Sequence, residues 1–244
     1  MEIYKIEFTK NDLKKFPAKE RNLFFLLGHI ANETKILQKL LLMCMSSRAT
    51  EPESWAGVTQ SFMISKLLAG KLFEGWEKVR KELFSDKTFN KNLQAEMGSL
   101  GQKSLAELQK FFGASNQFSK VRNTLSFHYD VSKLEEAFDG LLETNELSVL
   151  LAKESGNSLY YVSEIVTVET LVRGIYDGER EVAAKKFFDD LDNCSRHFGN
   201  FIESCLAVLL VRNLKKDVEF QKVEISDPPD LDSCKVPFFF LVRK

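Results

Sequence analysis

Hydrophobic residues recur at intervals of three and four along much of the chain, which is the spacing of one apolar face of an α-helix. Three long segments show it, at about residues 17–44, 52–83 and 179–212. The second stripe is Val58, Phe62, Ser65, Ala69, Leu72, Trp76, Val79 and Leu83, and the third is Ala184, Phe188, Leu191, Ser195, Phe198, Ile202, Cys205 and Leu209. Stripes this regular are typical of antiparallel helical bundles.

The first long segment is apolar on nearly every side. Its stripe is Leu23, Leu26, Leu27, Ile30, Thr34, Leu37, Leu41 and Cys44, and its opposite side carries Phe24, Phe25, Ile36, Leu40 and Met43. A helix of this kind is typical of the interior of a bundle, so we expect other helices to enclose it. On the same basis we expect its histidine, His29, to be packed rather than to bind a ligand.

Shorter helices are predicted over about residues 103–113, 117–129 and 131–142. Gly98 and Gly101 are expected to break the chain ahead of the first of them. Further along, the apolar segments 147–151 and 159–162 flank a polar, glycine-containing stretch at residues 154–157. This arrangement favours a small β-hairpin.

Short strands are predicted near both ends of the chain, where apolar residues alternate with polar ones or follow a turn. The candidates are residues 4–8, 218–225 and 238–242. The last contains Phe238, Phe239 and Phe240 in a row, so as a strand it needs cover on both faces. We therefore predict a mainly α fold, a single helical domain over residues 1–244 with four or more core helices. Strand-bearing extensions at residues 1–10 and 214–244 would form a small β appendage.

The composition narrows the class of protein. The chain has 244 residues, a formal net charge of −1 and 44% hydrophobic residues. With 12 glycines, 5 prolines and 4 cysteines it is neither collagen-like nor a disulfide scaffold. Its charge balance excludes a uniformly basic nucleic-acid-binding protein, while a local basic patch stays open.

Location and cofactors are predicted from what the sequence lacks. The first residues carry no apolar run of a secretory signal, and the longest uncharged apolar stretches, 40–45 and 205–211, are far shorter than the ~20 residues of a membrane span. The cysteines form no CxxC pair, and no glycine-rich phosphate loop or dinucleotide fingerprint occurs. We expect a cytoplasmic protein with reduced cysteines, no metal, no cofactor and no membrane contact.

One segment, residues 118–130, combines an apolar helical stripe with side chains that are common in active sites. On a helix, Arg122 lies about 40° to one side of the Phe118 direction and His128 about 80° to the other, ~9 Å apart along the axis. The apolar residues between them are Phe118, Val121, Leu125 and Tyr129. An arginine beside an apolar stripe is costly unless its charge stays hydrated or meets an anion. Arg122 and His128 are thus expected at the rims of a helix contact, made within the subunit or with a second copy.

This segment resembles the motif of the HEPN superfamily, the higher-eukaryote and prokaryote nucleotide-binding domain. The motif is an arginine, usually followed by a polar residue, then four to six residues and a histidine. Arg122 is followed by Asn123, and five residues separate it from His128. The sequence Arg-Asn…Phe-His-Tyr-Asp is also similar to that of bacterial proteins of this length grouped with the superfamily. The chain departs from the compact family pattern in that residues 129–244 follow the motif.

The resemblance implies a homodimer in which two motifs face each other and form one metal-independent endoribonuclease site. His128 would act as acid or base on the ribose 2′-hydroxyl or the leaving 5′-oxygen, and Arg122 would hold the scissile phosphate. Asn123 would orient the phosphate or the histidine, and Ser126 and Tyr129 would contact the substrate. The chemistry suits these side chains, because histidine titrates near neutral pH and a guanidinium can bind a phosphate through two nitrogens. A toxin or phage-defence role is implied, with any antidote or regulator a separate protein.

Other interpretations of the same residues stay open. His128 also suits a packed histidine in the core or an interface, and Arg122 suits an ion pair with Asp130 or a neighbouring helix. At the level of the whole chain, one alternative is a non-catalytic module of the same fold that binds nucleotide, RNA or a protein partner. A second is a structural dimerising bundle in which Arg122 and His128 belong to an internal network.

Overall fold

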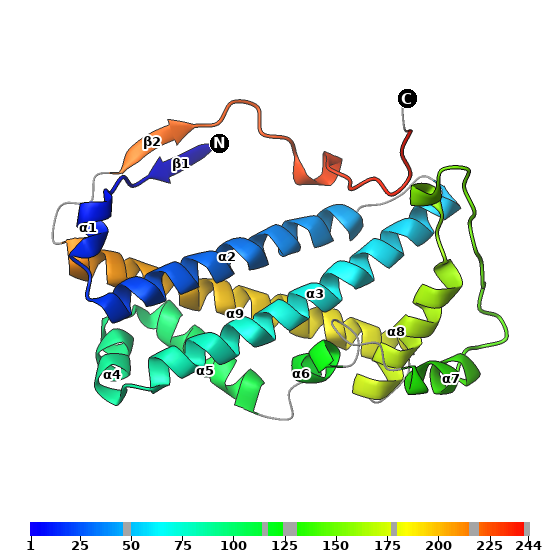
Figure 1. Ribbon diagram of the computed structural model, residues 1–244, viewed down its shortest axis with the longest axis horizontal. Helices are drawn as coiled ribbons and strands as arrows, with labels where there is room; N and C mark the ends of the chain where they lie inside the picture. The colour runs from blue at the N-terminus through cyan, green and yellow to red at the C-terminus, as the bar shows by residue number, and fades with distance from the viewer. Residues whose placement is uncertain (46–49, 114–116, 124–130, 177–179, 215–219, 242–244) are drawn as a thin grey trace. The chain divides into compact units, whose positions relative to one another are not determined.

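The computed structural model describes residues 1–45, 50–113, 117–123, 131–176, 180–214 and 220–241, and it is mainly helical, as predicted (Figure 1). The α-helices are α1 (Lys10–Lys14), α2 (Ala18–Met45), α3 (Glu51–Phe84), α4 (Lys87–Glu96), α5 (Ser99–Gly113), α6 (Gln117–Val121), α7 (Ser132–Asp139), α8 (Tyr161–Ile175) and α9 (Arg180–Leu214). Among the described residues, Ser155–Asn157 and Leu231–Ser233 form short 3₁₀ helices. The strands are β1 (Glu2–Lys5) and β2 (Gln221–Glu224).

The predicted β appendage is confirmed: β1 and β2 form a two-stranded antiparallel sheet that joins the N- and C-terminal segments (Figure 1). Glu2 lies opposite Glu224, and Ile3 lies opposite Val223. The expectation of a strand at residues 238–242 is wrong for its described part, since Phe238–Leu241 has no strand pairing. The backbone of Phe240 hydrogen-bonds instead to the side chain of Asn157.

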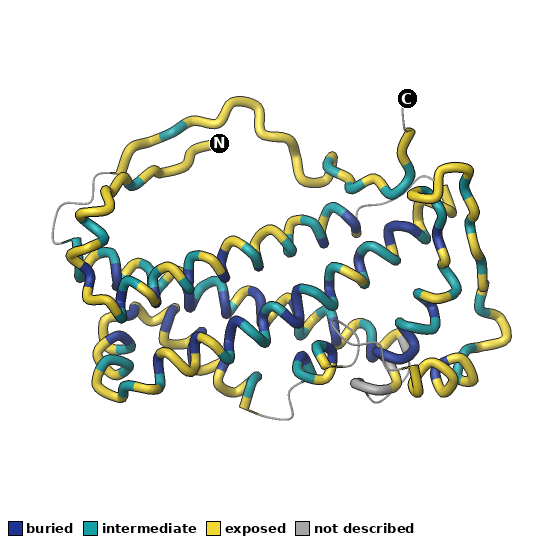
Figure 2. Tube along the Cα trace, viewed as in Figure 1, coloured by how far each residue is buried: buried dark blue, intermediate teal, exposed yellow. Residues whose placement is uncertain are grey.

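Residue contacts divide the chain into two compact units, and α2, α3 and α9 contribute to both. Unit 1 consists of Met1–Thr34, Glu74–Ala114 and Cys194–Asp230. Unit 2 consists of Lys35–Phe73, Ser115–Asn193 and Leu231–Lys244. Each unit has buried residues of its own on the helical stripes that the sequence predicts (Figure 2).

The core of unit 1 is centred on Trp76 of α3, which is fully buried. Its indole stacks on Phe112 of α5 with ring centroids 5.2 Å apart, and it meets Phe201 of α9 edge-on at 6.4 Å. Aromatic pairs in these arrangements add stability beyond the area they bury. The four-and-three stripe of α9 is buried here at Phe198, Ile202, Cys205 and Leu209.

Gly101 does not break the chain, which corrects the sequence-based expectation. It lies inside α5, where a Cβ atom would come within 2.5 Å of the Ser204 Cβ on α9. The glycine therefore permits a close approach of two helices, a role that a single sequence does not distinguish from a helix break.

In unit 2, α6 and α7 both pack on α8. Phe118 and Val121 of α6 are fully buried, and the Phe118 ring meets Phe187 of α9 edge-on at 6.5 Å. On α3, Trp55 stacks on Tyr161 of α8 with centroids 5.1 Å apart. These contacts place the N-terminal half of the predicted motif segment against the helices of its own subunit.

Helix α8 was not predicted from the sequence. The hairpin expected around residues 154–157 is represented by one antiparallel bridge between Leu150 and Leu159, and the chain then enters α8 at Tyr161. The residues that follow are rich in β-branched side chains, which favour strands when considered alone. Burial of Ile165, Val168 and Leu171 against the unit stabilises them as a helix instead.

Helix α2 is not enclosed on all sides, contrary to the expectation. Its predicted stripe is buried at Leu23, Leu27 and Ile30, among other positions, but Phe25 and Ile36 are exposed. The expectation for His29 is also wrong: its side chain is 71% exposed. In the part of the chain that the structure describes, no helix combines the length and the apolar character needed to cross a membrane.

Candidate functional site

Arg122 and Asn123 directly follow α6 and continue it as π-helical backbone. Arg122 is half-buried and Asn123 is exposed. The guanidinium Nη1 of Arg122 donates a hydrogen bond of 2.8 Å to Asn123 Oδ1. The two adjacent residues thus join a cation and an amide as one unit, and wide helical turns of this kind are frequent at functional sites.

The burial of Phe118 and Val121 decides how this cation is held. Both side chains are covered within the subunit, so the described part of the apolar stripe packs on helices of the same chain. Of the two packing arrangements that the sequence allowed for it, the contact within the subunit is the one observed. Arg122 follows this buried stripe directly and is half-buried, and its Nε is shielded from solvent.

The remaining predicted site residues, Ser126, His128 and Tyr129, lie outside the described residues, as does Asp130. The predicted pairing of Arg122 with Asp130 and the packing of His128 are therefore not tested. Arg122 and Asn123 are the members of the predicted site that the structure brings together.

Unit 2 contains a second cation that the sequence analysis did not single out. Lys66 of α3 is half-buried, and burial lowers the pKa of its ammonium, against the opposing influence of Glu164 on α8. Desolvation disfavours the charged form of a lysine, which explains the direction of the shift. The sequence signal was weak, because Lys66 adjoins the apolar stripe of α3 rather than a recognisable motif.

An ion pair within α8 accompanies a hydrogen bond from α8 to the end of α7. Glu169, which is buried, accepts a hydrogen bond from Arg173 Nε, and Arg173 Nη2 donates to the Gly140 carbonyl at 2.6 Å. A buried carboxylate needs such partners, because its desolvation is otherwise costly. This contact is structural and fixes the end of α7 on α8.

A serine–histidine pair occurs in unit 1. His197 Nδ1 lies 3.3 Å from Ser104 Oγ, and burial, with Arg196 and Lys103 nearby, lowers the pKa of His197. Ser104 is 1% exposed, so its hydroxyl cannot meet a substrate as a nucleophile does. We assign the pair to helix packing between α5 and α9.

Within the described ranges, no group of three or more His, Cys, Asp or Glu side chains is arranged to hold a metal ion. Burial raises the pKa of the Cys205 thiol to about 12, so this cysteine is protonated and unreactive.

Comparisons with protein-family models, curated proteins and solved structures find no match to this chain.

Proposed function

We propose that this chain is a HEPN-type endoribonuclease that cleaves RNA without a metal, at a site built from Arg122, Asn123 and His128. The observation that carries the proposal is the Arg122–Asn123 unit: a half-buried arginine whose Nη1 donates to the adjacent amide oxygen at 2.8 Å, directly after an apolar stripe that is buried in the same subunit. A guanidinium held in this way suits recognition of a phosphodiester, because its planar nitrogens match two phosphate oxygens.

The proposed reaction uses the nucleophile that RNA itself supplies. One copy of His128 takes the proton of the ribose 2′-hydroxyl, and the 2′-oxygen attacks the adjacent phosphorus. The bond from phosphorus to the 5′-oxygen breaks, and the second copy of His128 protonates that oxygen. Arg122 stabilises the charge that builds on the phosphate oxygens, and Asn123 keeps the guanidinium in place. The products are a 2′,3′-cyclic phosphate and a 5′-hydroxyl.

The two copies of His128 require a homodimer, and α7 offers a surface for it. Leu134 and Phe138 are exposed and lie four residues apart on α7, and Val131 just before the helix and Leu142 just after it are also exposed. An exposed apolar surface of this kind suits a contact with the same helix of a second copy about a two-fold axis. Because α7 begins at Ser132, a contact there would bring the two motif segments toward each other.

The experiment that tests the function is RNA cleavage in the presence of EDTA. Wild-type protein is expected to cleave mixed RNA, and Arg122→Ala and His128→Ala are each expected to lower the rate at least 100-fold, within the range that removal of one acid, base or charge-stabilising group produces. Lys120→Ala is the matched control, since Lys120 is an exposed cation on the same turn and should be dispensable. Binding of RNA without cleavage by the folded dimer would favour the non-catalytic module instead.

The cellular role follows from this activity. A cytoplasmic ribonuclease that needs no metal must be restrained, so we propose a toxin or phage-defence component that is controlled by a separate antidote or regulatory protein.

A further inference from the structure

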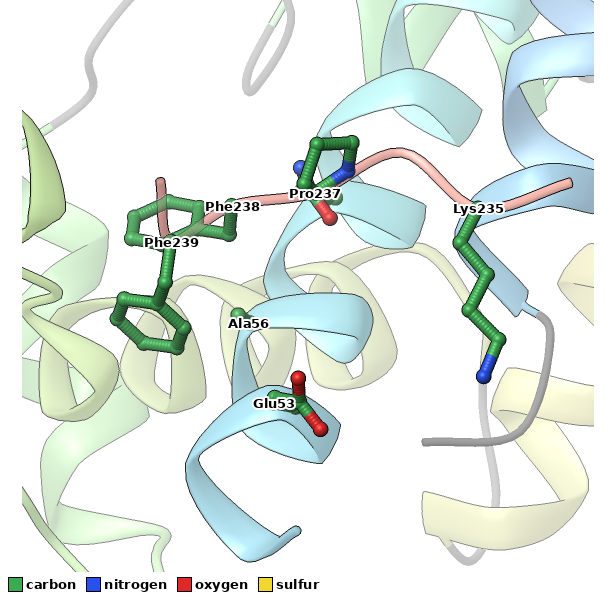
Figure 3. A pocket seen from close by; sticks show the side chains of 7 residues that line it. Glu53, Ala56, Lys235, Pro237, Phe238 and Phe239 are labelled. Carbon is green, nitrogen blue, oxygen red and sulfur yellow. The ribbon is translucent and has the colours of Figure 1, made fainter. Parts of the chain in front are cut away.

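Unit 2 contains a cavity of about 180 Å³ between the first turns of α3 and the C-terminal segment (Figure 3). Glu53, Ala56 and Gln60 line it from successive turns of α3. Phe238 and Phe239 line it from the C-terminal segment, together with Lys235. Figure 3 shows Lys235 on one side of Ala56 and the two phenylalanines on the other.

The C-terminal wall of the cavity is fixed in place by Asn157. Its Nδ2 donates to the carbonyl of Phe240 at 2.8 Å, and its Oδ1 accepts from the Phe240 N–H at 3.0 Å. A side-chain amide that pairs with both backbone groups of one residue fixes that residue as a β-ladder does. Phe238 and Phe239 are thereby positioned although the segment forms no strand in its described part.

The lining combines two opposite charges that are not joined to each other. Glu53 accepts from the Thr50 hydroxyl at 3.1 Å through Oε2, which leaves Oε1 able to accept from a ligand. Among the described residues, no ion pair links Glu53 to Lys235. A carboxylate and an ammonium that face the same cavity separately can each meet the opposite charge of one ligand.

Gln60 lines the cavity, but its Oε1 is shielded from solvent and has no hydrogen-bond partner in the described part of the chain. Because a water molecule does not reach this oxygen, a larger ligand in the cavity does not reach it either. The charged groups that a ligand would meet are therefore those of Glu53 and Lys235, and a ligand ammonium would supply a countercharge to Glu53.

We propose that this cavity binds a small zwitterion with an apolar side chain, of the chemical class of the apolar α-amino acids. Its ammonium meets Glu53, its carboxylate meets Lys235, and its side chain lies against Phe238 and Phe239. The size agrees: a dry cavity of about 150 Å³ admits benzene, whereas drug-sized ligands occupy about 300 Å³ or more. This inference rests on unit 2 alone and is independent of the proposed nuclease.

Calorimetric titration of the full chain with L-phenylalanine tests the proposal, with phenethylamine and phenylacetate as probes that each lack one charge. L-Phenylalanine is expected to bind at least tenfold more tightly than either. Glu53→Gln and Lys235→Gln are each expected to weaken its binding at least tenfold, while Glu51→Gln, an exposed acid on the same turn that does not line the cavity, leaves it unchanged.

Ala56→Leu fills the cavity and is expected to abolish binding, with the helical circular dichroism signal as the check that the variant folds. Three results would overturn the proposal: no binding of L-phenylalanine at millimolar concentration, equal binding of phenethylamine, or binding that survives both charge substitutions. Since Glu53 and Lys235 are exposed, their variants keep the test valid even if Ala56→Leu fails to fold.

Discussion

Arg212 near the end of α9 and Glu20 near the start of α2 form a hydrogen-bonded ion pair of 3.0 Å across 192 positions of sequence. Glu20 is buried, and Arg212 also binds Glu96 of α4 at 2.7 Å. The Glu20 carboxylate further accepts a hydrogen bond from Asn213. One guanidinium therefore joins three helices of unit 1, and removal of it leaves a buried carboxylate without its countercharge.

We predict that Arg212→Met lowers the free energy of unfolding by about 2–3 kcal/mol, somewhat less than the loss of a fully buried pair because Arg212 retains partial exposure. Urea unfolding followed by circular dichroism measures it. Arg80→Met is the matched control: its partner, Glu77, and Arg80 itself are both well exposed, so the loss should stay under about 1 kcal/mol. Equal losses in the two variants would contradict the structural role of Arg212.

Two helical glycines should respond in opposite ways to alanine. Gly101→Ala places a methyl group against Ser204 and is expected to destabilise unit 1 by about 1–3 kcal/mol, the range for overpacking. Gly28→Ala, inside α2, meets no atom within 4 Å and is expected to stabilise the chain by about 0.5–1 kcal/mol through backbone entropy. Thermal unfolding of both variants tests the pair, and a stabilising Gly101→Ala would disprove the close approach of α5 to α9.

The lowered pKa of His197 predicts a pH dependence of stability. Burial, Arg196 and Lys103 disfavour its protonated form in the folded state, and Glu107 opposes them. The unfolded chain therefore binds more protons than the folded one once the pH falls below about 6.5. Stability contributed by the neutral imidazole is fully present above that pH and is lost as the pH decreases toward the folded-state pKa.

We expect His197→Gln to flatten the decrease of urea midpoint between pH 7 and pH 5, compared with wild type. His29→Gln, at an exposed position, controls for removal of a histidine and should leave the wild-type slope. An unchanged slope in His197→Gln would show that the titration of His197 does not contribute to the pH dependence of stability.

The dimer surface proposed on α7 can be tested apart from the catalytic residues. Phe138→Glu introduces a charge into the exposed apolar surface and is expected to convert the dimer to a monomer and to abolish RNA cleavage, with folding intact because Phe138 is exposed. Sedimentation velocity measures the oligomeric state. Phe25→Glu, at an exposed phenylalanine of α2, should change neither property, and a dimer that survives Phe138→Glu would place the contact elsewhere.

The spacing of hydrophobic residues along the sequence predicted much of the fold. The stripes of α3 and α9 were predicted residue by residue, and most of their members are buried, because a long amphipathic helix must bury one face whatever its partner is. Short or β-branched helices depend on their neighbours instead. Helix α4, which precedes the glycines at 98 and 101, was not predicted. The start of α8 was predicted as part of a hairpin, because the stability of α8 as a helix comes from packing.

The candidate site was predictable in its residue types but not in its setting. The sequence identified Arg122 and Asn123 as a unit, and the structure joins their side chains by a hydrogen bond. It did not indicate that Phe118 would be covered within the subunit, because a stripe alone does not specify its partner. The hydrogen bonds between Asn157 and Phe240 were not predicted, because the two residues are 83 positions apart in sequence. The cavity beside them was not predicted for the same kind of reason, since its walls come from distant segments.

The most direct test of the central claim is the chemistry of the RNA ends. The purified protein is incubated in EDTA with an oligoribonucleotide and with the same oligonucleotide carrying a single 2′-deoxy sugar at the mapped cleavage site, and the products are analysed by mass spectrometry. The account predicts 2′,3′-cyclic phosphate and 5′-hydroxyl ends from the first substrate, and no cleavage at the modified position of the second. Cleavage at the 2′-deoxy position, or products with 5′-phosphate ends, would contradict attack by the ribose hydroxyl and with it the proposed roles of Arg122 and His128.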